Sequence, residues 1–249
     1  MSAAEFFLLV LAGLGAGLVG SIAGLASLIS YPALLAIGLP PVMANVTNTV
    51  ALVFSSGGSV LGSRPELGGQ ATRLRRLGVA AVLGGVIGGL LLLITPPGAF
   101  QLIVPWLIAF ASIAILVRRR PQEVHRVERG GAIGLTVGVF LVAVYGGYFG
   151  AAAGVLMLAL LLASTRESLA RSNAVKNVVL GLANAMAAAI FILFSSVHWS
   201  VVAPLALGCL AGGRLGPVVV RHAPARLLRI AIAVAGIGLA IHLGIDAYR

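Results

Sequence analysis

Four long stretches of this chain contain no Asp, Glu, Lys or Arg, and they restrict the folds that it can adopt. They cover residues 6–63, 77–117, 130–165 and 177–213. Only 9% of the 249 residues are charged, whereas about a quarter are charged in an average soluble domain. A helix of about 20 apolar residues crosses a bilayer, and every stretch is longer than that. The sequence therefore predicts a membrane protein with several spans.

The expected fold class is an all-α polytopic membrane protein, because no stretch alternates polar and apolar residues as the strands of a membrane barrel do. Two short apolar segments, 23–39 and 150–163, follow the first and fifth long helices across glycine-rich breaks. The long helices are predicted over residues 5–20, 44–62, 77–94, 99–117, 130–147, 174–197, 200–220 and 227–245.

An internal repeat emerges when the chain is aligned with itself so that position 23 falls on position 151, an offset of 128. Asn45 then falls on Asn173, and Pro96 falls on Pro224. A spaced glycine motif also recurs, first at Gly84, Gly85 and Gly88 and again at Gly212, Gly213 and Gly216. We therefore predict two homologous membrane repeats, residues 1–125 and 126–249, and call this displacement the repeat offset.

The basic residues predict how these repeats are oriented. Of the 17 Lys and Arg residues, 15 lie in four clusters, within 64–76, 118–129, 166–176 and 221–229. Loops at corresponding positions of the two repeats differ in charge, and basic short loops mark the cytoplasmic side, so the repeats are expected to be inverted.

Inversion requires an odd number of membrane crossings in each repeat. If segments 5–39 and 130–163 each enter the membrane and return to the same side, the basic residues other than Arg214 divide 15 to 1 between the two sides. Each repeat then has a glycine-broken re-entrant hairpin and three spanning helices. Both termini are predicted to be extracytoplasmic, in a multi-pass protein of the inner (cytoplasmic) membrane.

Inverted repeats with broken helices are typical of secondary transporters, whose binding sites form where the broken helices meet. The expected helix breaks are Gly20, Gly24, Gly147 and Gly150. Close helix packing by small residues is a second interpretation of these glycines, and it is compatible with the first.

The six acidic residues lie at predicted helix ends or in loops, which argues against a cation as the transported substrate. Arg214 lies inside a predicted span, where a bound anion could pair with its guanidinium. Alternatively, Arg214 extends to the membrane interface.

Two polar clusters lie near predicted helix starts, where free N–H groups and the helix dipole favour an anion. As N-caps, Asn45 and Asn173 would instead have a purely structural role. The clusters could also line two separate entrances. Tyr145 and Tyr148 could donate hydrogen bonds near the second break, or serve in packing. The clusters are Asn45, Asn48 and Thr49, and Asn173, Lys176 and Asn177.

Other functions find little support in the sequence. It has no Ser/His/Asp grouping, Walker loop or paired carboxylates, so we expect neither an enzyme nor a cofactor. Cys209 is the single cysteine and has no metal-binding partners in the sequence, so no metal site is predicted. The basic residues lie between apolar stretches rather than on a soluble face, which excludes nucleic acid as a partner. A homodimer is left open.

Several motifs resemble the TauE/SafE sulfite exporter family. The first repeat contributes Gly17–Gly24, Pro32, Gly38–Pro41 and Ala44–Asn48, and the second contributes Tyr145–Gly154, Asn173–Asn177 and Gly212–Gly216. This resemblance implies a permease for sulfite, sulfonates or related sulfur compounds. The chain departs from the family pattern at Ala23, Ala26, Ser27, Arg214 and Pro217.

Together these features predict an alternating-access exporter of a small sulfur oxyanion, such as sulfite or a short organosulfonate. Two alternatives remain: a passive anion channel or facilitator, and an uptake permease for another sulfur compound. A membrane scaffold without transport activity is disfavoured by the broken, inverted repeats.

Overall fold

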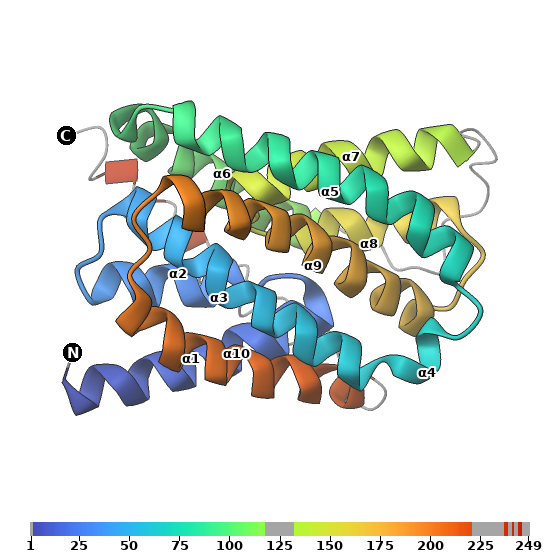
Figure 1. Ribbon diagram of the computed structural model, residues 1–249, viewed down its shortest axis with the longest axis horizontal. Coiled ribbons are helices and arrows are strands. Elements are labelled where there is room, and N and C mark those ends of the chain that lie inside the picture. Colours follow the sequence, from blue (N-terminus) through green and yellow to red (C-terminus); the bar gives the residue numbers. More distant parts are fainter. Residues whose placement is uncertain (1, 118–131, 221–236, 239–240, 242–243, 246–249) are drawn as a thin grey trace.

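The computed structural model describes residues 2–117 and 132–220, with residues 237, 238, 241, 244 and 245, and within them it contains helices and no strand (Figure 1). This confirms the all-α fold class. The predicted helix over 227–245 lies mostly outside the described residues. The helices are α1 (Ala3–Ala23), α2 (Ser27–Ala36), α3 (Pro41–Gly62), α4 (Arg64–Leu67), α5 (Ala71–Ile94), α6 (Pro97–Val117), α7 (Ala132–Tyr148), α8 (Ala153–Ser164), α9 (Leu169–Phe194) and α10 (Trp199–Val220).

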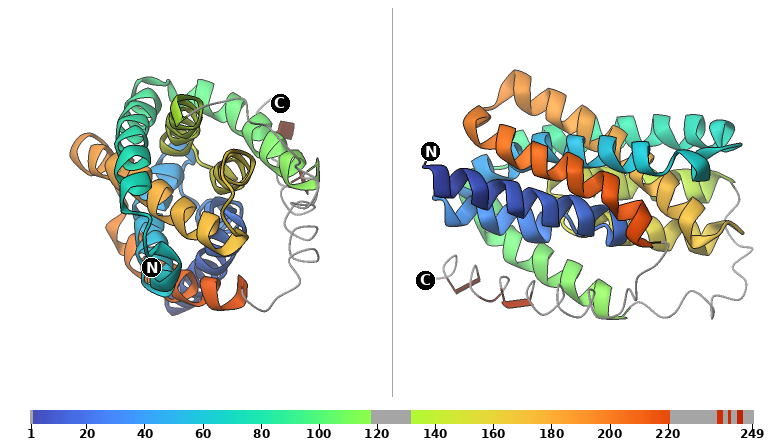
Figure 2. Two further views of the ribbon diagram at one scale, coloured as in Figure 1. Left: turned by 90° about the vertical axis from the view of Figure 1, so that its right-hand side faces the viewer. Right: turned by 90° about the horizontal axis from the view of Figure 1, so that it is seen from below.

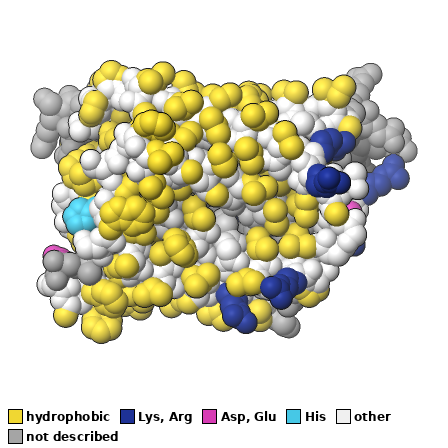
Figure 3. Space-filling model, viewed as in Figure 1, with side chains coloured by type: hydrophobic (Ala, Val, Ile, Leu, Met, Phe, Trp, Pro, Cys, Tyr) yellow, Lys and Arg dark blue, Asp and Glu magenta, His cyan; other side chains and the backbone are white. Residues whose placement is uncertain are grey.

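The outer surface suits a bilayer. In the described part of the chain, four helices are long and apolar enough to cross a membrane, namely α1, α5, α9 and most of α10. Large apolar side chains such as Phe7, Leu193 and Trp106 are exposed. Figure 3 shows hydrophobic side chains over the middle of one face, and Lys or Arg side chains between the lower middle and the right-hand end of the view.

Two helical hairpins have sharp breaks in the chain. Helix α1 ends at Gly24, whose φ of 79° is left-handed and whose N–H donates to the Gly20 carbonyl at 2.8 Å. Such a glycine commonly ends a helix because it lacks the Cβ that would clash there. Between α7 and α8, Gly150 has a φ of 73° and Ala152 a φ of 57°. Gly24 and Gly150 thus lie at the breaks, while Gly20 and Gly147 lie in the last turns of α1 and α7.

Two three-helix layers form the bundle. Helix α10 packs against α1 and α3, α5 packs against α7 and α9, and α3 crosses α9 between the layers. Figure 2 shows α1 alongside α10 in its right-hand panel. Each layer therefore combines helices from residues 1–125 with helices from residues 126–249.

The recurring glycine motif allows the helices of each layer to approach closely. A Cβ at Gly213 would meet the Ser55 carbonyl of α3, and a Cβ at Gly85 would meet the Ala183 carbonyl of α9. Gly84 and Gly212 face α7 and α1 in the same way. Small residues that bring backbones together are a common device in membrane bundles. Close packing is thus observed for this motif.

Helices α3 and α9 begin earlier than the sequence predicted. Pro41 is the first residue of α3, as is favourable for proline. Ser168 is the N-cap of α9, and its hydroxyl accepts the Arg171 N–H at 3.3 Å. Asn45 and Asn173 therefore lie in the second turns of their helices. The N-cap interpretation of these two asparagines was wrong, because the N-cap residue of α3 is a proline and that of α9 is a serine.

Candidate functional site

The hairpin breaks enclose a small cavity with α3 and α9. Its volume is about 60 Å³, room for a few water molecules or one small ion. Small and polar residues dominate its wall, and one cation, Lys176, lies among them. The lining consists of Gly20, Ser21, Gly24, Ala26, Ser27, Thr49, Leu52, Ser55, Ser56, Ser59, Gly146, Phe149, Gly150, Ala153, Gly154, Lys176, Asn177, Leu180 and Asn184.

The tips of the two hairpins touch at this cavity. A Cβ at Gly24 would overlap the backbone of Gly154, and a Cβ at Gly154 would overlap that of Gly24. Two backbones can approach so closely only where neither residue has a side chain. Irregular backbone at membrane depth is tolerated where protein buries it or a cavity hydrates it. At these tips Gly154 is buried, and both glycines line the cavity.

Lys176 extends from α9 to the broken end of α1. Its side chain is 1% exposed, and its Nζ donates to the carbonyls of Gly20 and Ser21, each at 3.1 Å. These carbonyls belong to the C-terminal end of α1, where the helix dipole favours a positive charge. Among the described residues, no Asp or Glu lines the cavity. The backbone carbonyls at the end of α1 therefore help to hold this positive charge.

Two further polar atoms in the cavity wall are buried without a hydrogen-bond partner in the described structure. They are the Ser21 hydroxyl and the Asn177 side-chain nitrogen. Buried polar atoms in folded proteins are nearly always paired, so an unpaired donor beside a cavity indicates a missing acceptor. By contrast, the Ser59 hydroxyl already donates to the Ser55 carbonyl at 2.8 Å. Lys176, Ser21 and Asn177 thus offer the donors that an anion requires.

Two asparagines that correspond at the repeat offset anchor the ends of the two hairpins. Asn173 on α9 donates to the Ser21 carbonyl at the end of α1 at 3.0 Å. Asn45 on α3 donates to the Tyr148 carbonyl at the end of α7 at 2.9 Å. Each side chain therefore fixes the broken helix of the other half. Their Oδ1 atoms are buried and accept no hydrogen bond in the described structure.

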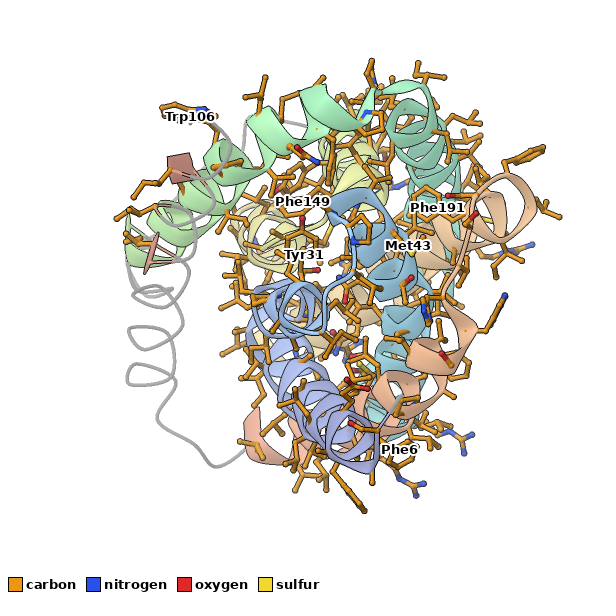
Figure 4. The ribbon with its side chains drawn as sticks, turned by 90° about the vertical axis from the view of Figure 1, so that its left-hand side faces the viewer. Phe6, Tyr31, Met43, Trp106, Phe149 and Phe191 are labelled. Atoms are coloured by element: carbon orange, nitrogen blue, oxygen red, sulfur yellow. The ribbon has the colours of Figure 1, made fainter. Side chains whose placement is uncertain are left out.

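Aromatic residues gather around the second break. Tyr31 and Phe149 pack edge to face with ring centroids 5.4 Å apart, as their neighbouring labels in Figure 4 show. The Phe100 ring packs against the rings of Tyr148 and Phe149, and the ring centroids are 5.9 Å apart in each pair. The Tyr145 hydroxyl donates to the Ala151 carbonyl at 2.6 Å, which closes the break on itself. In this structure Tyr145 and Tyr148 stabilise the second hairpin, and neither of them lines the cavity.

The remaining predicted contacts divide into two groups. Thr49 on α3 and Lys176 and Asn177 on α9 line one shared cavity, which favours a single site over the alternative of two separate entrances. Asn48 is buried beside them and donates to the Ser27 hydroxyl at 3.2 Å. Arg214 is exposed on α10 and does not line the cavity, which favours the alternative that it extends to the membrane interface.

Sequence analysis missed most of the hydroxyls and one amide in the cavity wall. Their signal was the spacing of serines on α3, where Ser55 and Ser59 are one turn apart on one face. Small polar residues inside an uncharged stretch are easily taken for packing residues. The missed lining residues are Ser21, Ser27, Ser55, Ser56, Ser59 and Asn184.

Comparison with known proteins identifies this architecture. A family model described as "Sulfite exporter TauE/SafE" matches residues 9–243. The chain belongs to the TauE/SafE family. As a TauE/SafE protein it is a multi-pass membrane transporter.

Curated relatives of this TauE/SafE protein carry transporter names that specify no substrate. It is 26% identical to "Probable membrane transporter protein ORF9" from Sinorhizobium sp. over 93% of this chain and 89% of that protein. It is 29% identical to a "Probable membrane transporter protein" from Haemophilus influenzae over 87% and 86%. For "Probable membrane transporter protein YfcA" from Escherichia coli K12 the identity is 27% over 94% and 87%. No solved structure matches the chain significantly.

Proposed function

We propose that this TauE/SafE protein exports a small sulfur oxyanion, such as sulfite or a short organosulfonate, across the cytoplasmic membrane. The observation that carries the proposal is the buried Lys176 ammonium in the wall of a cavity whose described lining is small and polar and includes no Asp or Glu. An oxyanion would accept hydrogen bonds from Lys176, Ser21 and Asn177. Hydrogen bonds between charged groups are the strong ones, and the low dielectric of the bundle strengthens them further.

Alternating access between two inverted repeats is the proposed mechanism. The helix order supports it: α3 begins at Pro41 and α9 at Leu169, and α5 begins at Ala71 and α10 at Trp199, so both pairs of helix starts are separated by the repeat offset. The packing partners correspond as well, since α1, α3 and α10 form one layer and α7, α9 and α5 the other. Rocking of one layer against the other would expose the cavity to each side in turn.

The proposed topology places both termini outside the cytoplasm. In its support, the described arginines 64, 73, 75, 76, 166 and 171 lie at the ends of α3, α5, α8 and α9. Figure 3 shows basic side chains toward one end of the visible face, and Figure 1 shows the N-terminus at the other end. Basic loops mark the cytoplasmic side. The test is to fuse to the N-terminus a reporter that works only in the cytoplasm. Activity of that fusion would contradict this topology.

The substrate is tested by equilibrium binding to the purified full-length protein. Sulfite, thiosulfate, sulfate and a two-carbon sulfonate would be titrated at constant ionic strength, with chloride as the background anion. We expect sulfite or the sulfonate to bind with saturation and the others more weakly. Absence of saturable binding by all four would refute the proposed substrate class.

Transport assays in proteoliposomes separate a carrier from a passive channel. A carrier that alternates its access shows saturable uptake and is accelerated by substrate on the opposite side. Flux that rises linearly with concentration and shows no such acceleration would favour the channel or facilitator.

A further inference from the structure

Among the residues that the structure describes, no side chain brings to the end of α7 the positive charge that Lys176 brings to the end of α1. At α1, the carbonyls of Gly20 and Ser21 accept hydrogen bonds from the Lys176 ammonium. The corresponding positions at the repeat offset are Tyr148 and Phe149 at the end of α7, and Asn48 in place of Lys176. Asn48 is shorter and neutral, and its side chain donates to Ser27 instead. One of two equivalent helix ends is therefore left without a cation.

Buried oxygen atoms lie near this second helix end. The Oδ1 atoms of Asn45 and Asn48 are buried and have no hydrogen-bond partner in the described structure. The two residues are three apart on α3, so they share one face of that helix. Asn45 also contacts the end of α7 directly, since its amide nitrogen donates to the Tyr148 carbonyl at 2.9 Å. Unpaired acceptors at a helix C-terminus attract a cation rather than an anion.

We infer that this end of α7 binds a monovalent cation, Na⁺, through the Oδ1 atoms of Asn45 and Asn48 and the backbone carbonyls that end α7. The ion would occupy the position at α7 that the Lys176 ammonium occupies at α1. Hard cations prefer such oxygen ligands. In transporters with inverted repeats, half-helix C-terminal ends and unwound carbonyls are known to hold coupling ions. Neither asparagine lines the cavity, so the ion would be enclosed by protein.

Such an ion would couple to the anion proposed above, and in this respect the inference rests on the proposed function. Thr49, next to Asn48, and Phe149, next to Tyr148, line the same cavity as Lys176. An anion in that cavity would be flanked by Lys176 on one side and Na⁺ on the other. Each ligand would lower the electrostatic cost of binding the other, and this coupling is reciprocal.

Cation binding is tested first without any sulfur compound. The melting temperature of the purified full-length protein would be measured in NaCl, KCl and choline chloride at equal ionic strength. A ligand that binds only the folded state raises the melting temperature by mass action. We expect a saturable rise in Na⁺ alone. Equal melting temperatures in the three salts would overturn the inference, whereas a sodium response without saturable binding of any of the four sulfur anions would leave it standing and contradict the proposed substrate class instead.

Substitution at Asn48 gives the second arm of the test. Asn48→Lys supplies an ammonium of its own, so we expect it to abolish the sodium response while keeping the melting temperature in choline at or above that of the wild type. Asn48→Met matches lysine in length and lacks its charge. It should lose the sodium response, and its melting temperature in choline should fall below that of Asn48→Lys. Asn45→Ala should raise the half-saturating Na⁺ concentration at least tenfold. An unchanged sodium response in Asn45→Ala and Asn48→Lys would overturn the site.

Discussion

The two glycine-broken hairpins have similar backbones but different chemistry. In the first, α1 ends at Gly24, and its last carbonyls bind the ammonium of Lys176. In the second, the chain turns through Gly150 and Ala152, and the Tyr148 carbonyl accepts an amide from Asn45. Aromatic rings surround the second break, while serines and Lys176 surround the first. A charged hairpin end and an aromatic hairpin end therefore face the same cavity.

This difference has a physical consequence for transport. A site that held two lysines would carry two buried charges, and each would require compensation in the low dielectric of the bundle. Asparagine at the corresponding position, Asn48, carries no charge, and its amide donates to the Ser27 hydroxyl instead. The first hairpin thus places the permanent charge of Lys176 beside an anionic substrate. The proposed Na⁺ would supply an exchangeable charge at the second hairpin. Each prediction below changes one hairpin and compares it with the other or with a matched position.

The largest expected effect comes from the contact between the two tips. Gly24→Ala adds a Cβ that would overlap the Gly154 backbone, at a left-handed φ of 79°. We expect a loss of about 3 kcal/mol or more, from backbone strain and overpacking together. Gly38 is a matched control, because its φ is 87° and no atom lies within 4 Å of an added Cβ. Gly38→Ala should cost only about 1 kcal/mol.

Thermal unfolding in detergent measures both variants. If Gly24→Ala and Gly38→Ala lower the melting temperature equally, the hairpin tips do not depend on their close contact.

Removal of the buried charge at the first hairpin should have the largest effect on substrate binding. Lys176→Met keeps the length of the side chain but removes its charge, so we expect the substrate Kd to rise roughly 30-fold or more, in line with about 2 kcal/mol or more for a buried charge contact. Stability should change little, because removing a buried charge also removes its desolvation cost. Arg214→Met is the matched control, since Arg214 is exposed on α10.

Binding isotherms of the best anion check this pair. We expect Arg214→Met to stay within about twofold of the wild type, as for a surface charge. An Arg214→Met effect as large as that of Lys176→Met would mean that the exposed arginine contacts the anion.

The paired asparagines should contribute similarly to stability at the two breaks. Asn173→Ala and Asn45→Ala each remove one donor to a buried carbonyl, at 3.0 and 2.9 Å. We expect each to cost about 1 kcal/mol, the usual net contribution of one hydrogen bond, since the Ser21 carbonyl keeps its bond from Lys176 when Asn173 is replaced. The double variant should lose nearly the sum, because the two bonds share no atom. Strong non-additivity in chemical unfolding would show instead that the two breaks act as one unit.

Much of the fold follows from the sequence, because uncharged stretches of fixed length leave few choices in lipid. The breaks near Gly24 and Gly150, the shared cavity residue Lys176 and the recurring glycine motif were all accessible from spacing and charge. The starts of α3 and α9 were misplaced, since Pro41 and Ser168 begin the helices about one turn before the asparagines. Pairwise contacts such as Asn173 with Ser21 depend on how distant helices cross, which local pattern does not specify.

Ala152 gives the smallest effect and the most direct comparison of the two turns. It is the one described residue other than glycine with a positive φ, and it corresponds to Gly24 at the repeat offset. The left-handed conformation strains alanine but not glycine, so Ala152→Gly should stabilise the protein by up to about 1 kcal/mol. A rise in melting temperature of roughly 2–4 °C would correspond to that gain. The Ala153→Gly control, in the first turn of α8, should instead destabilise by a few tenths of a kcal/mol to about 1 kcal/mol, because glycine weakens a helix. If both substitutions lower the melting temperature, Ala152 carries no releasable strain, and its side chain contributes to packing that Gly24 does not need.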